Sequence, residues 1–255
     1  MSDGERDETD DGGRAGCERD DGHSKTADSG SETTVVFLGL NDAGQRVYEY
    51  LCDRDGVFVH SLLTTREQLR VVEAAGPDYL VSCGYSHIVP EEVLEIPAEG
   101  CLNLHPALLP YNRGANPNVW SIVEGTPAGV TLHYMDPGID TGDIVAQREV
   151  ETDFSDSGRD LYERLKDAQV DLFQEVWPAV EAGEASALSQ DDDAGTYHTT
   201  DEFDDLCELD PDESMPVGAL LDQLRALTFP PYDNAYVEID GERYFVEVDI
   251  KRAEE

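Results

Sequence analysis

The stretch TVVFLGLNDAGQRVYEYLCD, residues 34–53, joins a continuous apolar run to an amphipathic helix. An apolar run without alternation is typical of a strand that is buried on both faces of a parallel sheet. Gly39, Asn41 and Gly44 lie at the turn between them. The complete G-x-G-x-x-G fingerprint of dinucleotide-binding proteins is absent, so we interpret the glycines as packing residues and rank a dehydrogenase last among the functions considered.

The strand-then-helix pattern continues along the chain. Residues 56–65 and 65–76 predict a second strand and a helix, and residues 78–86 predict a third buried strand. This order indicates an α/β fold with a mostly parallel, Rossmann-like sheet and right-handed crossovers. Residues 89–96 predict a short helix with Pro90 in its first turn, where no amide donor is needed.

Two turn-rich loops follow, one on each side of a short strand. CLNLHPALLP (101–110) predicts a strand that ends in a proline-bounded loop, and ANPNVWSIVEG (115–125) predicts a helix. GVTLHYM (129–135) predicts an alternating strand, which leads into the loop DPGIDTGD (136–143). Loops at the ends of strands often carry binding and catalytic groups, so this region is the candidate site.

The rest of the chain predicts two more elements of the main domain and a small C-terminal unit. Residues 144–150 predict a strand, and residues 160–183 predict a long amphipathic helix that closes the domain. The polar segment 186–198 is expected to cross the surface. From Pro216 a helix, a turn and a hairpin follow, with Asp240-Gly241 at the hairpin tip.

These patterns divide the chain into four parts. We predict a disordered acidic tail over 1–33, a main α/β domain over 34–185, a linker over 186–215 and a small helix-plus-hairpin unit over 216–255. The tail has almost no apolar residues, so it cannot bury the surface that folding requires.

Charge and cysteine content narrow the class of protein. The chain has 57 acidic and 17 basic residues, a net charge of −40, of which the first 33 residues carry −7. Acidity spread over the whole chain is typical of a halophilic protein, and at low salt it repels polyanions. Five scattered cysteines and the lack of long apolar segments predict free, mostly buried thiols, no metal site, no membrane span and a cytoplasmic location.

Asn103, His105 and Asp140 are the candidate catalytic residues. Asn103 and His105 are two apart near the end of a strand, so both side chains lie on one face. An amide can hold a carbonyl oxygen as it becomes an oxyanion, an imidazole can act as acid or base, and a carboxylate can orient the imidazole. The only thiol nearby is Cys101, so direct attack by a substrate amine is easier to defend than a covalent intermediate. From spacing alone, a structural role for the Asn-x-His pair remains open.

The segments NLHPALLPYNRG (103–114) and GVTLHYMDPGIDTGDI (129–144) strongly resemble the 10-formyltetrahydrofolate-dependent formyltransferases. The resemblance covers approximately residues 34–150. It implies a sheet of the formyltransferase type and a catalytic triad of Asn103, His105 and Asp140. An amine would attack the formyl carbon of 10-formyltetrahydrofolate, and Asn103 and protonated His105 would stabilise the oxyanion.

The resemblance also implies that two loops bind the formyl donor, largely through their backbone. The residues expected to contribute are Gly84, Tyr85, Ile88, Val89, Pro90, Asp136, Gly138 and Ile139. We interpret His87 and His133 as structural residues. The chain near 62–67 is shorter than is usual in the family, which predicts a smaller sheet and a more open folate side.

The acceptor is expected to be a small amine. Tyr111, Arg113, Asn116 and Trp120 are the candidate substrate-binding residues. The segment LRALTFPPYDNAYVEIDGERYFV (224–246) resembles the tail of sugar N-formyltransferases, which implies a nucleotide-linked amino sugar.

Two alternatives stay open from the sequence. One is a methionyl-tRNA formyltransferase-like enzyme, although a short acidic C-terminal unit is a poor electrostatic match for tRNA. The other is a folate-binding module without activity. The oligomeric state is also open, with a homodimer as one alternative.

Overall fold

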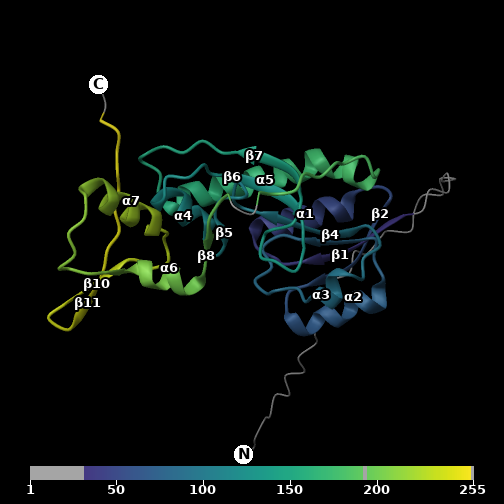
Figure 1. Cartoon of the computed structure of the whole chain (residues 1–255), viewed down its shortest axis with the longest axis horizontal. Helices are drawn as coiled ribbons and strands as arrows, with labels where there is room; N and C mark the ends of the chain where they lie inside the picture. The colour runs from purple at the N-terminus through teal and green to yellow at the C-terminus, as the bar shows by residue number, and fades with distance from the viewer. Residues whose placement is uncertain (1–31, 192–193, 254–255) are drawn as a thin grey trace, which may run out of the picture.

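The computed structural model describes residues 32–191 and 194–253. The first strand already begins at Thr33, and the rest of the expected tail, apart from Glu32, lies outside the described residues. Figure 1 shows a larger α/β unit joined to a smaller C-terminal unit, with α6, α7 and the β10–β11 hairpin at the far end from β1 and β2.

A six-stranded sheet forms the centre of the larger unit, and its strand order is β2-β1-β3-β4-β6-β7. The first four strands along the chain are parallel, whereas β6 and β7 are antiparallel to their neighbours. The predicted mostly parallel sheet is therefore confirmed. The strands are β1 (Thr33–Leu38), β2 (Val57–Leu63), β3 (Tyr79–Ser82), β4 (Gly100–His105), β6 (Gly129–Tyr134) and β7 (Ile144–Glu149).

Helices cover both faces of this sheet because the buried strands are apolar on both sides. One face packs against α1 (Asp42–Asp53), α4 (Pro117–Val123) and α5 (Gly158–Glu181), and Trp177 and Phe173 of α5 lie at the centre of that core. The other face packs against α2 (Arg70–Ala75) and α3 (Glu91–Leu94). In Figure 1, α2 and α3 lie below the sheet and α5 lies above it.

Two of the predicted helices differ from their sequence patterns. Residues 65–76 form a short 3-10 turn, η1 (Arg66–Leu69), followed by α2, and Thr65 and Gln68 make a capping box at its start. Residues 89–96 contain only the four-residue α3, for which Pro90 is the N-cap and does not belong to the first turn.

The segment 186–215 contains regular structure. It includes β8 (Tyr197–His198), α6 (Thr200–Cys207) and β9 (Glu208–Leu209). Strand β8 pairs with β5 (Arg113–Gly114), which follows the proline-bounded loop of the candidate site. Strand β9 joins β10 (Tyr236–Ile239) and β11 (Glu242–Phe245) in the small sheet, and α7 (Val217–Leu227) packs against α4.

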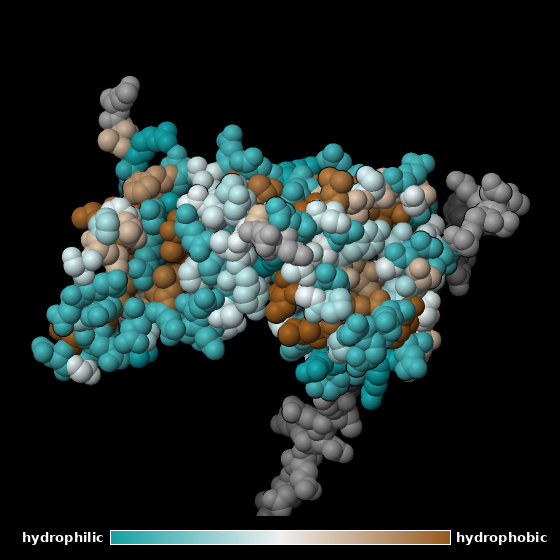
Figure 2. Space-filling model, in the orientation of Figure 1, coloured by the Kyte–Doolittle hydropathy of each residue, from teal (hydrophilic) through white to brown (hydrophobic). Residues whose placement is uncertain are grey.

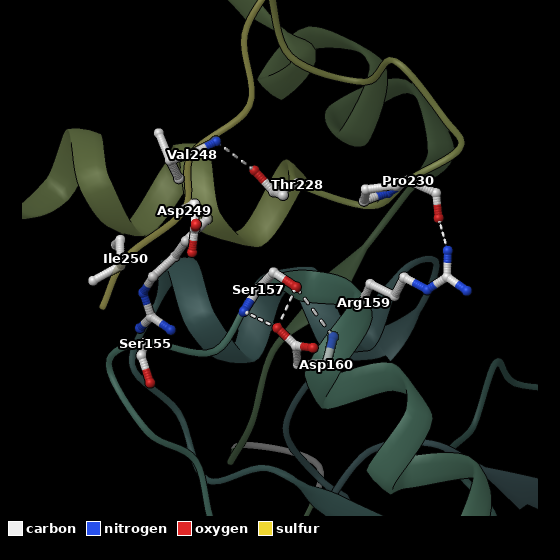
Figure 3. A pocket seen from close by; sticks show the side chains of 10 residues that line it. Ser155, Ser157, Arg159, Asp160, Thr228, Pro230, Val248, Asp249 and Ile250 are labelled. Atoms are coloured by element: carbon white, nitrogen blue, oxygen red, sulfur yellow. Dashed lines mark hydrogen bonds between the residues drawn. The ribbon is translucent and has the colours of Figure 1, made fainter. Parts of the chain in front are cut away.

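A cavity of about 240 Å³ marks the junction of the two units, and Figure 3 shows its lining. Ser157 and Asp160 form the capping box that begins α5. Arg159 donates to the carbonyl of Pro230, and the Val248 amide donates to the Thr228 hydroxyl at 3.1 Å. The contact between Arg159 and Pro230 attaches the C-terminal unit to the N-terminus of α5.

Candidate active site

Strand pairing brings the candidate catalytic residues together. Asn103 of β4 lies opposite His133 of β6, and Asp140 comes from the loop after β6. The Asp140 carboxylate lies 3.6 Å from His105 Nδ1 through Oδ2 and 3.6 Å from His133 Nε2 through Oδ1. Asn103 Nδ2 donates to Asp140 Oδ1 at 3.4 Å. These four residues lie close together, and we call them the catalytic cluster because they include the three candidate catalytic residues.

His133 belongs to this cluster, although its sequence position in an alternating strand indicated only a structural residue. Its Nδ1 donates to the Tyr134 carbonyl at 2.7 Å, which leaves Nε2 facing the cluster. Nε2 lies 3.3 Å from Asn103 Nδ2 and 3.6 Å from Asp140 Oδ1. His133 therefore contacts both Asn103 and Asp140, and only the register between β4 and β6 could have revealed this.

The Asp140 carboxylate is strongly biased toward its charged form. Burial by itself raises the pKa of Asp140, but the imidazoles of His105 and His133 and the backbone amide of Gly114 outweigh burial. The pKa of Asp140 therefore lies well below its usual value of 3.8. Such a group is a poor proton acceptor and a good electrostatic partner for a cation.

The backbone around the cluster is held in unusual conformations. Asp140 has φ of 54° and Asn112 has φ of 56°, a left-handed region that costs non-glycine residues energy. The Asn112 carbonyl accepts from His105 Nε2 at 3.0 Å, which fixes a proton on that nitrogen. Gly114, with φ of 88°, donates its amide to Asp140 Oδ2 at 2.9 Å, and a Cβ there would lie 2.3 Å from the His198 carbonyl.

Cys101 does not supply a nucleophile. Its side chain is buried against the α2–α3 side of the sheet, and Sγ donates to the Leu94 carbonyl at 3.4 Å. Burial raises the pKa of the Cys101 thiol to about 12. Cys83 and Cys207 are also free and buried, whereas Cys52 is disulfide-bonded, so the expectation of free thiols is wrong for Cys52. Cys52 is not free because it has a covalent partner, and the spacing of cysteines along the chain does not indicate that bond.

The two loops expected to bind the donor lie on one side of the sheet. Tyr85 and Val89 of the first loop and Met135 at the start of the second pack against the same buried cluster. Ile88 and Ile139 expose 71% and 40% of their surface, which is high for apolar side chains.

The other residues of these loops hold the turns. Gly84 has φ of 72°, and a Cβ there would collide with the Asn41 side chain at 2.3 Å. Asp136 accepts from the Gly138 amide and the Thr141 hydroxyl at 3.0 and 2.6 Å. Pro90 caps α3.

The candidate substrate-binding residues are not gathered in one place. Asn116, with φ of 51°, lines a cavity of about 550 Å³. Trp120 is buried and stacks on His198 with ring centres 3.9 Å apart. Arg113 is also buried and donates to the Gln190 side chain, whereas Tyr111 is exposed on the loop before it.

The 550 Å³ cavity lies where α1, α4, α5 and the C-terminal unit meet, and we call it the aromatic cavity. Tyr162 and Phe229 stack edge to face at 5.3 Å, and Phe229 lies 5.9 Å from the Tyr232 ring. Arg159 and Lys166 bring positive charge into the lining, and Asp42 and Glu163 of the same lining pair with Lys166 at 2.9 and 2.8 Å. Burial by itself lowers the pKa of Lys166, but these two carboxylates outweigh burial and raise that pKa. The lining residues include Asn41, Asp42, Asn116, Asn118, Phe203 and Asn234.

The described part of the chain contains no group of three or more His, Cys, Asp or Glu side chains placed to hold a metal ion. Within it no helix combines the length and apolar character needed to cross a membrane.

Comparison with known proteins shows which class of protein has this fold. Residues 36–177 match the Formyl transferase family, and residues 202–252 match the N-formyltransferase dimerization C-terminal domain. The chain therefore belongs to the formyl transferase family, as its sequence resemblance implied.

Relatives fall into two groups by acceptor. A dTDP-4-amino-4,6-dideoxyglucose formyltransferase from Mycobacterium bovis is 39% identical over 149 residues, 58% of this chain and 63% of the relative. A methionyl-tRNA formyltransferase from Lachnospira eligens is 36% identical over 173 residues, 66% of this chain and 52% of the relative. The chain thus matches less than two thirds of the length of these relatives.

Solved structures extend the comparison to most of the chain. A 4-N formyltransferase from Francisella tularensis superposes with a TM-score of 0.79 at 26% identity, covering 88% of this chain and 100% of the other. The formyltransferase PseJ from Anoxybacillus kamchatkensis, in complex with UDP-4,6-dideoxy-4-formamido-L-AltNAc and tetrahydrofolate, gives 0.58 at 33% identity, covering 68% and 89%.

Proposed function

We propose that this protein transfers a formyl group from 10-formyltetrahydrofolate to the amine of a nucleotide-linked amino sugar. The observation that carries the choice of acceptor is the aromatic cavity, which combines aromatic rings with the guanidinium of Arg159. Aromatic rings suit a nucleobase, and a guanidinium suits a phosphate group. Asn116 of the cavity is two residues along the chain from Gly114, whose amide donates to Asp140 of the catalytic cluster.

The donor fits the loops 84–90 and 135–140. Exposed Ile88 and Ile139 offer apolar surface to a flat ring system. The Tyr85 hydroxyl is buried without a hydrogen-bond partner among the described residues, which is costly unless a ligand supplies one. PseJ binds tetrahydrofolate, and its relationship to this chain supports the same donor here.

Formyl transfer then follows from the cluster. The amine lone pair attacks the formyl carbon, and the carbonyl oxygen becomes an oxyanion that Asn103 Nδ2 and protonated His105 stabilise. Asn103 can turn toward that oxygen because its present contacts, at 3.3 and 3.4 Å, are long. Collapse breaks the bond from carbon to N10 of the donor, and N10 gains the proton that the amine loses.

In this scheme Asp140 stays a carboxylate. Its lowered pKa suits it to hold a cationic His105 in place, and proton movement then runs through a water molecule. The buried, protonated thiol of Cys101 supports direct attack without an acyl-enzyme.

A homodimer built from the C-terminal unit completes the proposal. Residues 202–252 match a family model described as a dimerization domain. Strand β11 is an edge strand of the small sheet, and its Tyr244 and Phe245 expose about half of their surface. Figure 2 shows hydrophobic patches on this unit within a largely hydrophilic surface. A second copy of the chain would cover them.

The test is an acceptor panel assayed with 10-formyltetrahydrofolate. The panel contains dTDP-linked and UDP-linked 4-amino-4,6-dideoxy sugars and Met-tRNA, and tetrahydrofolate release is followed by absorbance. The buffer should contain molar KCl, because the acidic side chains of a protein with a net charge of −40 repel one another unless salt screens them. We expect turnover with at least one sugar nucleotide and none with Met-tRNA.

Two outcomes would overturn the proposal. Formylation of Met-tRNA alone would assign the protein to the tRNA branch of the family. Tight tetrahydrofolate binding without turnover of any acceptor would identify a folate-binding module. Measuring activity again at low salt tests whether the protein is halophilic, since we expect both activity and melting temperature to fall.

A further inference from the structure

The segment 186–198, expected only to cross the surface, lies along the catalytic loops; we call its described residues, 186–191 and 194–198, the strap. Leu188 pairs with Ile144 through two backbone hydrogen bonds of 2.8 and 2.9 Å. Farther along, Thr196 accepts from the Asn112 amide at 2.9 Å and donates to the Asn112 side chain at 3.0 Å. The strap thereby contacts Asn112, whose backbone carbonyl accepts a hydrogen bond from His105 Nε2.

Gln190 is the strap residue that contacts the Asp140 loop. Its Nε2 donates to the carbonyl of Asp140 at 2.9 Å and to the carbonyl of Gly142 at 2.7 Å. Its Oε1 accepts from Arg113 Nη2 at 2.8 Å and from Nε at 3.3 Å. Both N–H groups and both lone pairs of the amide are therefore in use.

This pattern leaves one orientation for the Gln190 amide. A flipped amide would place Oε1 against two carbonyl oxygens and Nε2 against a guanidinium, which are both repulsive. The Gln190 amide therefore bridges the Asp140 loop and Arg113 of β5 and sets the distance between them. Asp140 needs such support, since its backbone has φ of 54° while its carboxylate faces two imidazoles.

We propose that Gln190 is a positioning residue for formyl transfer, which holds the main chain of Asp140 and Gly142 so that the Asp140 carboxylate stays beside His105 and His133. This inference rests on the proposed function. The alternative is a purely structural role, in which Gln190 only anchors the strap to Arg113.

Gln190→Glu separates the two roles. A glutamate keeps the contact with Arg113 as a charge-assisted pair, but it has no N–H to donate and turns an anion toward two carbonyls. We expect Gln190→Glu to melt within a few degrees of the wild type, while kcat falls about ten- to a hundredfold. Gln190→Ala should show a similar loss of kcat with a lower melting temperature. KM for the sugar nucleotide should change less than kcat in both variants.

Gln223→Ala is the matched control. Gln223 Nε2 donates to the Leu206 carbonyl at 2.8 Å, so the variant also loses a glutamine-to-carbonyl hydrogen bond, but within the C-terminal unit. We expect a lower melting temperature with kcat unchanged. Near-wild-type kcat in Gln190→Glu would overturn the inference, and so would an effect confined to KM.

If the wild type turns over no acceptor, the proposed function is refuted, but the positioning role of Gln190 is not. A crystal structure of Gln190→Glu then still tests that role. We expect the hydrogen bond from the Gly114 amide to Asp140 Oδ2, 2.9 Å in the wild type, to break. An Asp140 carboxylate in its original place would refute the positioning role, whatever the activity.

Discussion

The catalytic cluster and the aromatic cavity are built in different ways. The cluster takes its side chains from two paired strands and one loop of a single domain, and His105, His133 and Asp140 are almost fully buried. The cavity takes its side chains from helices on both sides of a domain junction and from an exposed turn at Phe229–Asn234. Under the proposed function, backbone pairing fixes the geometry of the chemistry, whereas acceptor choice would depend on side chains that can vary separately.

The largest effect should follow loss of the oxyanion-stabilising groups. We expect Asn103→Ala and His105→Ala to lower kcat by about 10²–10³-fold or more, because each removes a group aimed at the developing charge. Steady-state kinetics with the best acceptor of the panel give the measurement. His60→Ala is the control, since His60 is exposed on the edge strand β2. Retained activity in His105→Ala would remove the cluster from the mechanism.

His133→Phe should have an intermediate effect. The ring volume stays, but both nitrogens that link Asn103 and the Tyr134 carbonyl are lost. We expect kcat to fall about ten- to a hundredfold through misplacement of the Asn103 amide. If kcat is unchanged while the melting temperature falls, His133 is a packing residue only, as its sequence position suggested.

Changes in the aromatic cavity should affect binding more than chemistry. We expect Phe229→Ala and Tyr232→Ala to raise KM for the sugar nucleotide about tenfold, the equivalent of roughly 1.4 kcal/mol, with kcat within about twofold. Phe58→Ala, on β2, controls for loss of an exposed aromatic ring. A fall in kcat with constant KM would mean that the cavity is not where the acceptor binds.

The smallest effect concerns acid stability. Because the pKa of Asp140 is lowered in the folded protein, its stabilising contribution is present above the unfolded value of 3.8 and is lost as pH falls below it. Asp140→Asn should therefore show less loss of melting temperature than the wild type between about pH 5 and pH 3. Parallel curves for the two proteins would contradict the lowered pKa.

Much of the cluster could be predicted from local sequence. Asn103 and His105 share a face because strand side chains alternate, and Pro106 restricts His105 to extended backbone geometry. Periodicity likewise predicted the parallel sheet and the long helix α5. By the same alternation Cys101 lies on the face of Asn103, but this is less informative, since its thiol is buried and protonated.

What the sequence determined by itself is the order of strands and helices and the identity of the chemical groups, because both follow from contacts between near neighbours. The tertiary structure decided which distant groups meet. The antiparallel register of β6 places His133 beside Asn103, the strap brings Gln190 to Asp140, and the domain junction assembles the aromatic cavity. Such contacts depend on strand register and domain packing, and no local pattern encodes them.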